Sequence, residues 1–585
     1  MIKALLNGEK AQQREFKLWG RIPHVNWADF FVLFGIIGII FGLTHFGHQA
    51  TLATRPAVVI DLSFWMLPLY AFNSLVRGLC AYGLSLVFTL LYGYWAAKDK
   101  WAERVLVPLL DILQSIPVLG FMPGFVLAFA RLFPHSNVGL EIAAILMIFT
   151  GQVWNMTFSF YNSLKSIPKD QLEAAQTYKF DGWQRFLWVE LPFSSVGLIW
   201  NSMMSMAGGW FFLMINESFR LGSKDFRLPG IGSYMSVAVE RANVPAMIAA
   251  VAVMSLMIVI LDQFLWKPVT TWAQKFRVEE TGAVETASSW FLDVLRRSKV
   301  LDDILRFAKW LLWRNRKVKR KSFLEETGGA RKKAALPSAF LSRVALAGLV
   351  SLLFYGAWML YKLVAGVSFA SWQEIFASAA LTFFRVMGVV TLASLWIIPV
   401  GLLIGLSPRW SSIFQPVIQV AASFPAPMLF PIFVALFVRF HISLNWGSMV
   451  LMMLGAQWYI LFNVIGGAVA IPSDLLEVAK SYHFSLAQKL WKVYLPGIFP
   501  YLVTGWVTAA GGAWNASIVS EYVVFKDRLL VANGLGAHIS QAAAGGDFHK
   551  LTASVLVMSC AVVLFNQLVW RRMYRLAEGQ YSLSK

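Results

Sequence analysis

The chain alternates long apolar runs with short polar interruptions over most of its 585 residues. A helix needs about 20 mostly apolar residues to cross a bilayer. The runs form two sets of six. The first set covers roughly 28–46, 77–97, 106–133, 138–160, 193–216 and 245–266, and the second roughly 340–364, 379–406, 413–439, 446–468, 497–520 and 551–570. We therefore expect an all-α polytopic membrane protein with about twelve transmembrane helices.

Two of these runs, 106–133 and 413–439, contain prolines, which interrupt helical hydrogen bonding. We expect each run to break into two shorter helices. Backbone groups freed at membrane depth are tolerated where they line a cavity. Gln114, Ser115 and Ser423 in these runs are therefore candidates for the translocation pathway.

The two sets are copies of one unit. Residues of many different types recur at a fixed distance along the chain. The offset is 308 residues in the earlier part of each copy and 304 in the later part. Examples are Trp154 with Trp458, Glu217 with Glu521, Arg77 with Arg385, and Pro117 with Pro425. Such self-similarity indicates a repeated architecture. Six crossings is an even number, so both copies enter the membrane from the same side. The repeat is then parallel, with a pathway expected between the halves.

The sequence predicts a first repeat over 1–266, a basic linker over 267–337 and a second repeat over 338–585. Six of the eight residues in 314–321 are basic. Positive charge collects on the cytoplasmic side of membrane proteins, so we expect the linker and both termini to be cytoplasmic. Part of the linker is amphipathic. A helix on the anionic inner leaflet and a solvated linker both remain open.

Two polar segments, 168–192 and 472–496, occupy matched places between the fourth and fifth runs of each copy. An even number of crossings from a cytoplasmic start puts both in the cytoplasm. Each begins with Ile-Pro, continues through an acidic helix start and ends in Leu-Pro. We expect a short helix that passes a push from a soluble partner to the adjoining spans.

These segments carry a resemblance to a known family. Glu173-Ala174-Ala175, followed after thirteen residues by Val189-Glu190-Leu191-Pro192, resembles the EAA loop of bacterial ABC importer permeases. Glu477-Val478-Ala479 and Val493-Tyr494-Leu495-Pro496 repeat it at the same spacing. The resemblance implies coupling helices that dock into ATP-binding subunits, with each Glu in a polar contact. The family's Gly after the motif is replaced by Lys179 and His483, which leaves the local turn geometry as a question for the structure. The implied coupling residues are Glu173, Ala174, Ala175, Lys179, Leu191, Pro192, Glu477, Val478, Ala479, His483, Leu495 and Pro496.

Further stretches look like the nitrate, sulfonate, taurine and bicarbonate branch of that family. They are the Ser-x-Pro stretches at Ser115 and Ser423, the glycine-tryptophan runs ahead of Glu217 and Glu521, and Gly230-Ile231-Gly232 with Gly534-Leu535-Gly536. The resemblance implies two fused permease copies with the fold of a type I ABC importer permease, in the inner membrane. It also implies two ATP-binding subunits, a periplasmic or other external solute-binding protein, and a small solute, such as an anion, moved by alternating access.

Composition supports a membrane protein, because only 14% of residues are charged where about 25% is usual in soluble proteins. The net charge is +20, and the basic stretches are separated by long apolar runs. This pattern favours contact with membrane lipids over binding to nucleic acid. Cys80 and Cys560 cannot build a disulfide framework or a metal site. The chain contains neither a phosphate-binding G-x-x-x-x-G-K-[ST] nor an H-E-x-x-H. We expect no catalytic residue, metal or cofactor, and ATP hydrolysis on separate subunits.

Four further residues are candidates for the pathway, each with an open structural alternative. Trp154 and Trp458 either face the solute or pack between helices. Glu217 and Glu521 either line the external mouth or pair with a neighbouring arginine. The alternative function is a secondary transporter with the same two-fold repeat, which normally carries buried acidic or histidine relays; few are visible here.

Overall fold

The computed structural model describes residues 27–51, 59–221, 224–276, 289–298, 339–525 and 528–580. It divides into two compact units. The smaller unit comprises Met1–Phe41 and Ser288–Lys332, and the larger comprises Gly42–Ala287 and Lys333–Lys585. The larger unit holds the helices of both copies, apart from the part of the first copy that precedes Gly42. The predicted basic run 314–321 and both ends of the chain lie outside the described residues.

The smaller unit contains the start of α2 (Trp27–Thr51) and α13 (Trp290–Arg297). Ser289 caps α13 by accepting a hydrogen bond from the Leu292 backbone amide at 3.3 Å. Ser298, just past α13, donates to the buried Asp29 carboxylate at 2.9 Å. Helix α13 is amphipathic, with Val294 buried and the arginines of its last turn exposed.

The first repeat continues in the larger unit as a run of helices with one small hairpin. Its elements are η1 (Phe64–Met66), α3 (Leu67–Lys98), α4 (Lys100–Ser115), α5 (Val118–Leu132), α6 (Val138–Lys165), α7 (Lys169–Thr177), α8 (Gly182–Arg185), the π turn η2 (Phe186–Glu190), α9 (Leu191–Glu217), β1 (Arg220–Leu221), β2 (Lys224–Asp225), α10 (Ile231–Glu240), α11 (Val244–Leu261), the π turn η3 (Asp262–Trp266), α12 (Lys267–Ala273) and η4 (Gln274–Phe276). Strands β1 and β2 pair antiparallel, with Arg220 opposite Asp225.

The second repeat follows the same order. Its elements are α15 (Ala339–Val364), α16 (Phe369–Gly405), α17 (Pro408–Ser423), η5 (Ala426–Met428), α18 (Phe430–Arg439), α19 (Leu444–Val469), α20 (Ser473–Ser481), α21 (Leu486–Lys489), the π turn η6 (Leu490–Tyr494), α22 (Leu495–Ser520), β3 (Tyr522–Phe525), β4 (Arg528–Val531), α23 (Leu535–Gly545), α24 (Phe548–Phe565), the π turn η7 (Asn566–Trp570) and α25 (Arg571–Gln580). Strands β3 and β4 pair antiparallel from Tyr522 opposite Val531 to Phe525 opposite Arg528. Even the π turns recur at the offset of 304.

Within the described residues, ten helices are long and apolar enough to cross a membrane, or eleven when α4 and α5 count as one span bent by 92°. The predicted run 413–439 is the remaining one, and it consists of α17, η5 and α18. Both proline-containing runs therefore break as expected, next to Pro117 and Pro425.

The broken pair α4–α5 still crosses the bilayer. Glu103 in α4 pairs with Lys165 at the end of α6 at 2.8 Å. At the other end, a Cβ on Gly139 at the start of α6 would meet the Phe129 carbonyl of α5 at 2.4 Å. Helix α6 has 28 residues, about 42 Å at 1.5 Å per residue, which is enough to span the hydrocarbon. The pair therefore runs antiparallel to α6 and completes the crossing between α3 and α6.

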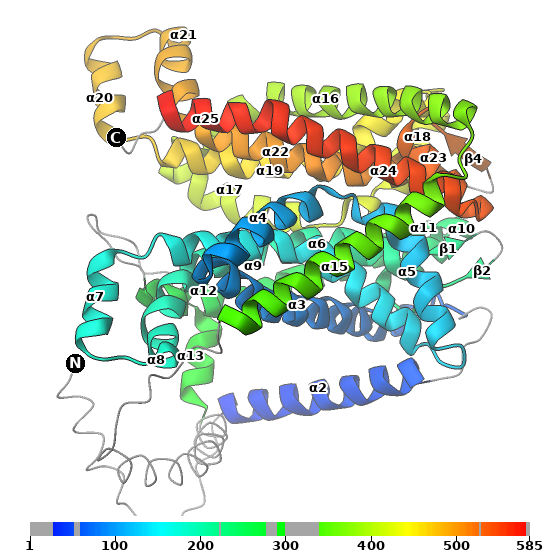
Figure 1. Ribbon diagram of the computed structural model, residues 1–585, viewed down its shortest axis with the longest axis horizontal. Helices are drawn as coiled ribbons and strands as arrows, with labels where there is room; N and C mark the ends of the chain where they lie inside the picture. The colour runs from blue at the N-terminus through cyan, green and yellow to red at the C-terminus, as the bar shows by residue number, and fades with distance from the viewer. Residues whose placement is uncertain are drawn as a thin grey trace, which may run out of the picture. The chain divides into compact units, whose positions relative to one another are not determined.

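The larger unit has two distinct ends (Figure 1). Helices α7, α8, α20 and α21 project at one end, which we call the hairpin end. The hairpins β1–β2 and β3–β4 lie at the opposite end, which we call the strand end. One continuous apolar core joins residues of both repeats between these ends.

Buried ion pairs hold the helices together near the strand end. Arg77 in α3 donates to Glu141 of α6 at 2.6 Å and to Glu217 of α9 at 2.7 Å, with Arg77 and Glu217 fully buried. In the second repeat Arg385 donates to Glu521 at 2.8 Å, and to the side-chain oxygen of Asn445 at 2.9 Å. Asn445 stands at the position that matches Glu141.

The glycine motifs after these helices complete the same clusters. The Gly232 amide donates to Glu217 at 2.8 Å, and the Gly536 amide donates to Glu521 at 2.9 Å. A Cβ on Gly230 would lie 2.3 Å from the Glu217 carboxyl group. Only glycine lets the backbone approach a carboxylate so closely.

We expect Glu521→Ala to destabilise the protein by about 3–5 kcal/mol, because it leaves the Arg385 guanidinium buried without a counter-charge. Glu141→Asn is the matched control, since it reproduces the arrangement of the second repeat and leaves Arg77 paired with Glu217. We expect a smaller loss for it, roughly 1–2 kcal/mol. Denaturant unfolding of the detergent-purified variants measures both. Equal losses would contradict a central role for the Arg–Glu pair.

Candidate coupling hairpins and central cavity

The two helical hairpins at the hairpin end are built by the same local signals. Helix α7 follows Pro168 and α20 follows Pro472. The second helix of each hairpin begins with a capping box, made by Asp181 and Gln184 in the first repeat and by Ser485 and Gln488 in the second. In a capping box the two side chains satisfy amides that the helix start leaves unpaired. The duplicated caps fix where each hairpin turns back toward the bilayer.

The turn inside each hairpin is left-handed although it lacks glycine. Lys179 has φ +54° and His483 has φ +50°. The Phe180 amide donates to the Ala175 carbonyl at 3.0 Å, and the Phe484 amide donates to the Ala479 carbonyl at the same distance. This is the Schellman pattern, which normally places glycine at the left-handed position. The departure from the family pattern therefore leaves the turn intact, at a cost of roughly 1–2 kcal/mol per residue.

The expected coupling residues fall on one exposed surface and one buried contact in each hairpin. Glu173, Ala174, Glu477 and Val478 are exposed, and within the described residues neither glutamate forms an ion pair. Ala175 and Ala479 point the other way and are 3% and 2% exposed. A larger side chain there would push the helix off its support. The acidic position is therefore free to meet a partner, and the third position of each motif serves packing.

The Leu-Pro pairs lie in helices and not in loops. Leu191 and Pro192 begin α9, and Leu495 and Pro496 begin α22, so each hairpin runs directly into a span. The continuous helices Gly182–Glu217 and Leu486–Ser520 have 36 and 35 residues. Each widens to a π turn just before its proline, which has no N–H to donate. The second helix of each hairpin and the span that follows it thus form one continuous helix.

Sequence patterns alone missed a buried ion pair beneath the first hairpin. Glu190 is fully buried. It accepts a hydrogen bond from Lys98 of α3 at 2.6 Å and forms an ion pair with Arg185 of α8, whose Nε lies 2.9 Å from the carboxylate. The matched positions in the second repeat hold Tyr494, Leu406 and Lys489. The first hairpin is therefore fastened to α3 by charge and the second is not. The sequence does show that Lys98 and Glu190 are charged where the second copy has Leu406 and Tyr494. That these two residues form a pair is visible only in the folded structure.

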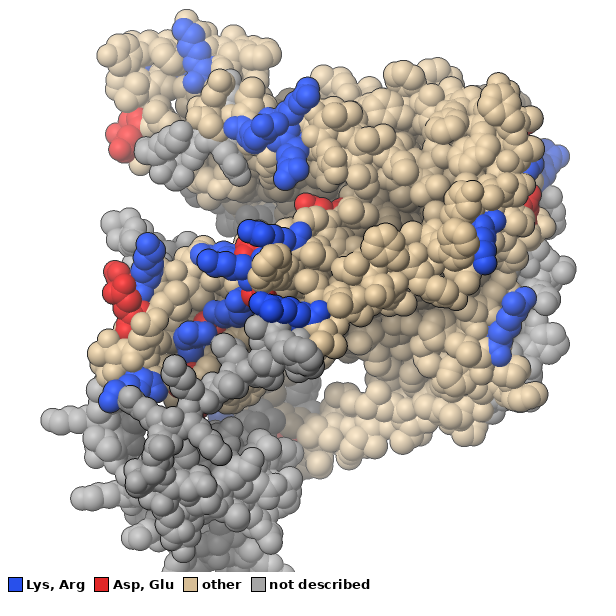
Figure 2. Space-filling model, viewed as in Figure 1, with Lys and Arg blue, Asp and Glu red and all other residues tan. Residues whose placement is uncertain are grey.

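A cavity of about 1120 Å³ lies between the two repeats of the larger unit. Ser166, at the end of α6 next to α7, lines it, as do Arg571 and Tyr574 of α25. In the other direction the lining ends at Phe212 and Ala516. Figure 2 shows the surface hollowed between the two projecting hairpins. The cavity thus opens toward the hairpin end.

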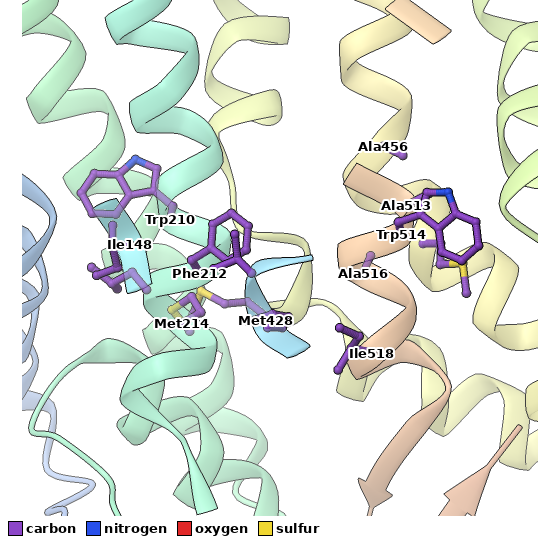
Figure 3. Close-up of a cluster of buried hydrophobic side chains, with 14 of the residues drawn as sticks. Ile148, Trp210, Phe212, Met214, Met428, Ala456, Ala513, Trp514, Ala516 and Ile518 are labelled. Atoms are coloured by element: carbon purple, nitrogen blue, oxygen red, sulfur yellow. The ribbon is translucent and has the colours of Figure 1, made fainter. Parts of the chain in front are cut away.

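An apolar cluster closes the cavity toward the strand end. Figure 3 shows Phe212 and Met214 of α9 beside Met428 of η5, with Ile518 of α22 nearby. Phe212 is 8% exposed and Met428 is fully buried. The contact joins the first repeat to the broken span of the second, so separating the repeats here requires exposing this cluster.

The structure places the pathway candidates in two groups. Gln114, Ser115, Trp154 and Trp458 line the cavity. Ser423 is not among the lining residues, although its neighbours Ala422 and Phe424 are. Its hydroxyl donates to the Gln419 carbonyl at 2.8 Å. Glu217 and Glu521 do not line the cavity either, and lie in the buried ion pairs with Arg77 and Arg385.

One cavity residue missed in the sequence explains how the first broken span is tolerated. The Val118 amide, freed at the break after Pro117, donates to the side-chain oxygen of Asn515 in α22 at 2.8 Å. An unpaired amide at membrane depth costs several kcal/mol. Asn515 supplies the missing acceptor from the other repeat. The matched position in the first repeat is Phe211, so this link exists on one side only.

In the part of the chain that the structure describes, no three His, Cys, Asp or Glu residues come together as a metal site. The chain is similar to a known family in both repeats. Residues 89–265 and 397–578 match the family described as "Binding-protein-dependent transport system inner membrane component". These two segments make up more than half of the chain. The chain belongs to this family. It is a multi-pass inner membrane protein with two copies of the permease component in one polypeptide.

Curated relatives of this permease family come from several transport systems. The chain is 29% identical to the taurine transport system permease protein TauC of Escherichia coli, over 33% of this chain and 63% of the relative. It is 31% identical to the bicarbonate transport system permease protein CmpB of Synechococcus elongatus, over 26% and 52%. It is 27% identical to the nitrate import permease protein NrtB of Leptolyngbya laminosa, over 34% and 67%. The chain therefore spans about half to two thirds of the length of these relatives.

We expect Lys179→Gly to relieve backbone strain and stabilise the α7 turn by about 1 kcal/mol, because glycine adopts a positive φ without a Cβ clash. His483→Gly should act in the same direction in α20. Hydrogen–deuterium exchange of the amides at 179–180 and 483–484 measures the effect as slower exchange. Lys179→Pro is the control and should unravel the turn, since the Lys179 amide donates to the Gln176 carbonyl at 2.9 Å. Faster exchange in the glycine variants would contradict the strained turn.

Proposed function

We propose that this chain supplies both transmembrane halves of an ATP-driven importer for a small solute. The observation that carries this proposal is the pair of matched hairpins, which project at the same end of the larger unit where the cavity opens. Each presents an exposed glutamate, Glu173 or Glu477, on a short helix that continues into a span. Two separate ATP-binding subunits would each grip one hairpin, and a solute-binding protein would deliver solute at the strand end.

The distribution of charge supports placing the hairpin end in the cytoplasm. Figure 2 shows Lys and Arg gathered mostly at that end of the visible face. The described basic residues there include Lys98, Lys165, Lys489, Arg571 and Arg572. Basic residues are retained on the cytoplasmic side of membrane proteins. The basic linker and both termini would then be cytoplasmic as well.

Alternating access follows from the two continuous helices and the closed cluster. A 36-residue helix is about 54 Å long, so Gly182–Glu217 reaches from the first hairpin to the apolar cluster near the strand end. Closure of the ATP-binding subunits would bring α7 and α20 together and shut the cavity mouth. The same rotation would part Phe212 from Met428 and open the strand end. The arrangement described here corresponds to the inward-facing state.

The solute is proposed from the relatives, whose names cover taurine, bicarbonate and nitrate transport. A small anion or sulfonate fits the family branch. A carboxylate relay typical of a secondary transporter finds little support, because Glu217 and Glu521 are engaged by arginines and lie outside the cavity lining.

We expect the double variant Glu173→Arg with Glu477→Arg to lose association with the ATP-binding subunits while still inserting in the membrane. Reversing a charge at a docked interface costs roughly 2–5 kcal/mol, and the hairpins lie outside the bilayer. At the lower end this is about a thirtyfold loss of affinity. Co-purification of the ATP-binding subunit and ATP-dependent solute uptake measure it.

The control for this double variant is Glu374→Arg, which makes the same charge change at an exposed position near the start of α16, at the strand end. We expect it to leave co-purification unchanged. Normal co-purification and uptake in the Glu173→Arg, Glu477→Arg protein would show that these hairpins are not the coupling elements. ATP hydrolysis by the purified chain alone would contradict the separate ATP-binding subunits.

Cysteine labelling tests the orientation. In a background with Cys80 and Cys560 changed to serine, we expect Ser481→Cys in α20 to resist an impermeant reagent added to intact cells. Arg528→Cys in β4 should be labelled, because the strand end would face outward. Both positions are exposed. Labelling of Ser481→Cys without lysis would reverse the topology.

A further inference from the structure

The cavity carries two charged side chains of opposite sign, one from each repeat. Among the described residues that line it, Asp111 of α4 and Arg571 of α25 are the only charged ones. Both side chains line the same cavity, and no ion pair joins them among the described residues. The partner of Asp111 is Gln114, whose amide donates to it at 3.1 Å. Both charges therefore remain available to a solute.

The matched residues on the other side of the two-fold repeat bind to one another and do not line the cavity. We call that side the closed side, and the side with Asp111 and Arg571 the open side. Asp111 corresponds to Gln419, and Arg571 corresponds to Lys267. Gln419 donates across the repeats to Asp262 at 2.9 Å, and Lys267 donates to Gln263 at 3.0 Å. None of these four residues lines the cavity. On that side the polar groups satisfy one another.

On the cavity side the acid and the amide have exchanged places. Asn566 replaces Asp262, and Asp111 replaces Gln419. No hydrogen bond joins Asp111 to Asn566 within the described part of the structure, and both line the cavity together with Gln567. The closed side shows that this spacing between repeats can hold a direct contact. On the open side the donors Asn566, Gln567 and Arg571 belong to one repeat and the Asp111 carboxylate belongs to the other, and all four line the cavity.

We propose that Asp111 and Arg571, with Asn566 and Gln567, form a single solute site for a small zwitterion that carries both an oxyanion group and an ammonium group. The guanidinium and the two amides offer donors for the oxyanion, and the carboxylate accepts from the ammonium. A simple anion would satisfy Arg571 but would be repelled by Asp111. A zwitterion satisfies both charges at once. This inference rests on the proposed transport function, and it selects an aminosulfonate or amino-acid-like solute over nitrate or bicarbonate.

Taurine and ethanesulfonate are suitable probes, because they differ only in the ammonium group. Binding of each to the purified full chain is measured by calorimetry. We expect taurine to bind more tightly. Asp111→Asn should weaken taurine binding by about tenfold or more, the effect of removing a hydrogen bond to a charged group. It should leave ethanesulfonate unchanged or tighter, whereas Arg571→Gln should weaken both.

Asp262→Asn and Lys267→Gln are the matched controls, since they make the same changes on the closed side. We expect taurine affinity within about twofold of the unaltered chain, because neither residue lines the cavity. Equal binding of the two probes by the unaltered chain, binding of neither, or an unchanged probe ratio in Asp111→Asn would each overturn the proposal. Failure of the coupling function would instead appear as lost co-purification and uptake with taurine binding retained.

Discussion

The need to satisfy every backbone polar group without water governs this structure. Within a bilayer an unpaired amide or carbonyl has no solvent to bind, so the chain must be helical wherever lipid surrounds it. The exceptions in the larger unit are instructive. The break at Pro117 occurs where the chain lines the cavity, and Asn515 of the other repeat accepts from the freed Val118 amide. The need to pair backbone polar groups therefore also limits where a membrane helix can end. In the first repeat that place is the cavity, where a side chain can accept the freed hydrogen bond.

Most structural features occur in both repeats, as expected for a duplicated unit. A few occur in one repeat only, and these make the two halves different. The Schellman turns, the capping boxes, the π turns and the Arg–Glu pairs all recur. The ion pair of Glu190, the link through Asn515 and the open acid–amide site do not. Two identical chains related by a two-fold axis would carry each such feature twice. A fused chain has no such restriction, because each copy accepts substitutions independently.

The contacts within each repeat differ in kind from the contacts between the two repeats. Near the strand end, the arginine of each second span is bound to the fourth and fifth spans of its own repeat. Arg77 forms ion pairs with Glu141 and Glu217, and Arg385 forms an ion pair with Glu521 and a hydrogen bond with Asn445. Breaking such a pair would leave a buried charge without its counter-charge, which costs about 3–5 kcal/mol. Between the repeats the described contacts at Phe212 and Met428 are apolar and non-directional. Hydrogen bonds between the repeats are also present, from the Val118 amide to Asn515 and from Gln419 to Asp262. Halves that are each held together by buried ion pairs, and that meet largely through apolar contacts, can rock as bodies.

Local and periodic signals in the sequence were enough to predict the protein class, the repeat and the positions of the two hairpins. Apolar runs of spanning length, prolines within two of them and motifs at a fixed offset require no knowledge of distant contacts. The sequence left the roles of Glu217 and Glu521 open, since an intramembrane carboxylate suits either a pathway or an ion pair. Helix packing brings Arg77 to Glu217, Lys98 to Glu190 and Asp111 to the lining of a shared cavity. These partners lie far apart along the chain, and which of them meet is decided by how whole helices pack, which no local pattern encodes.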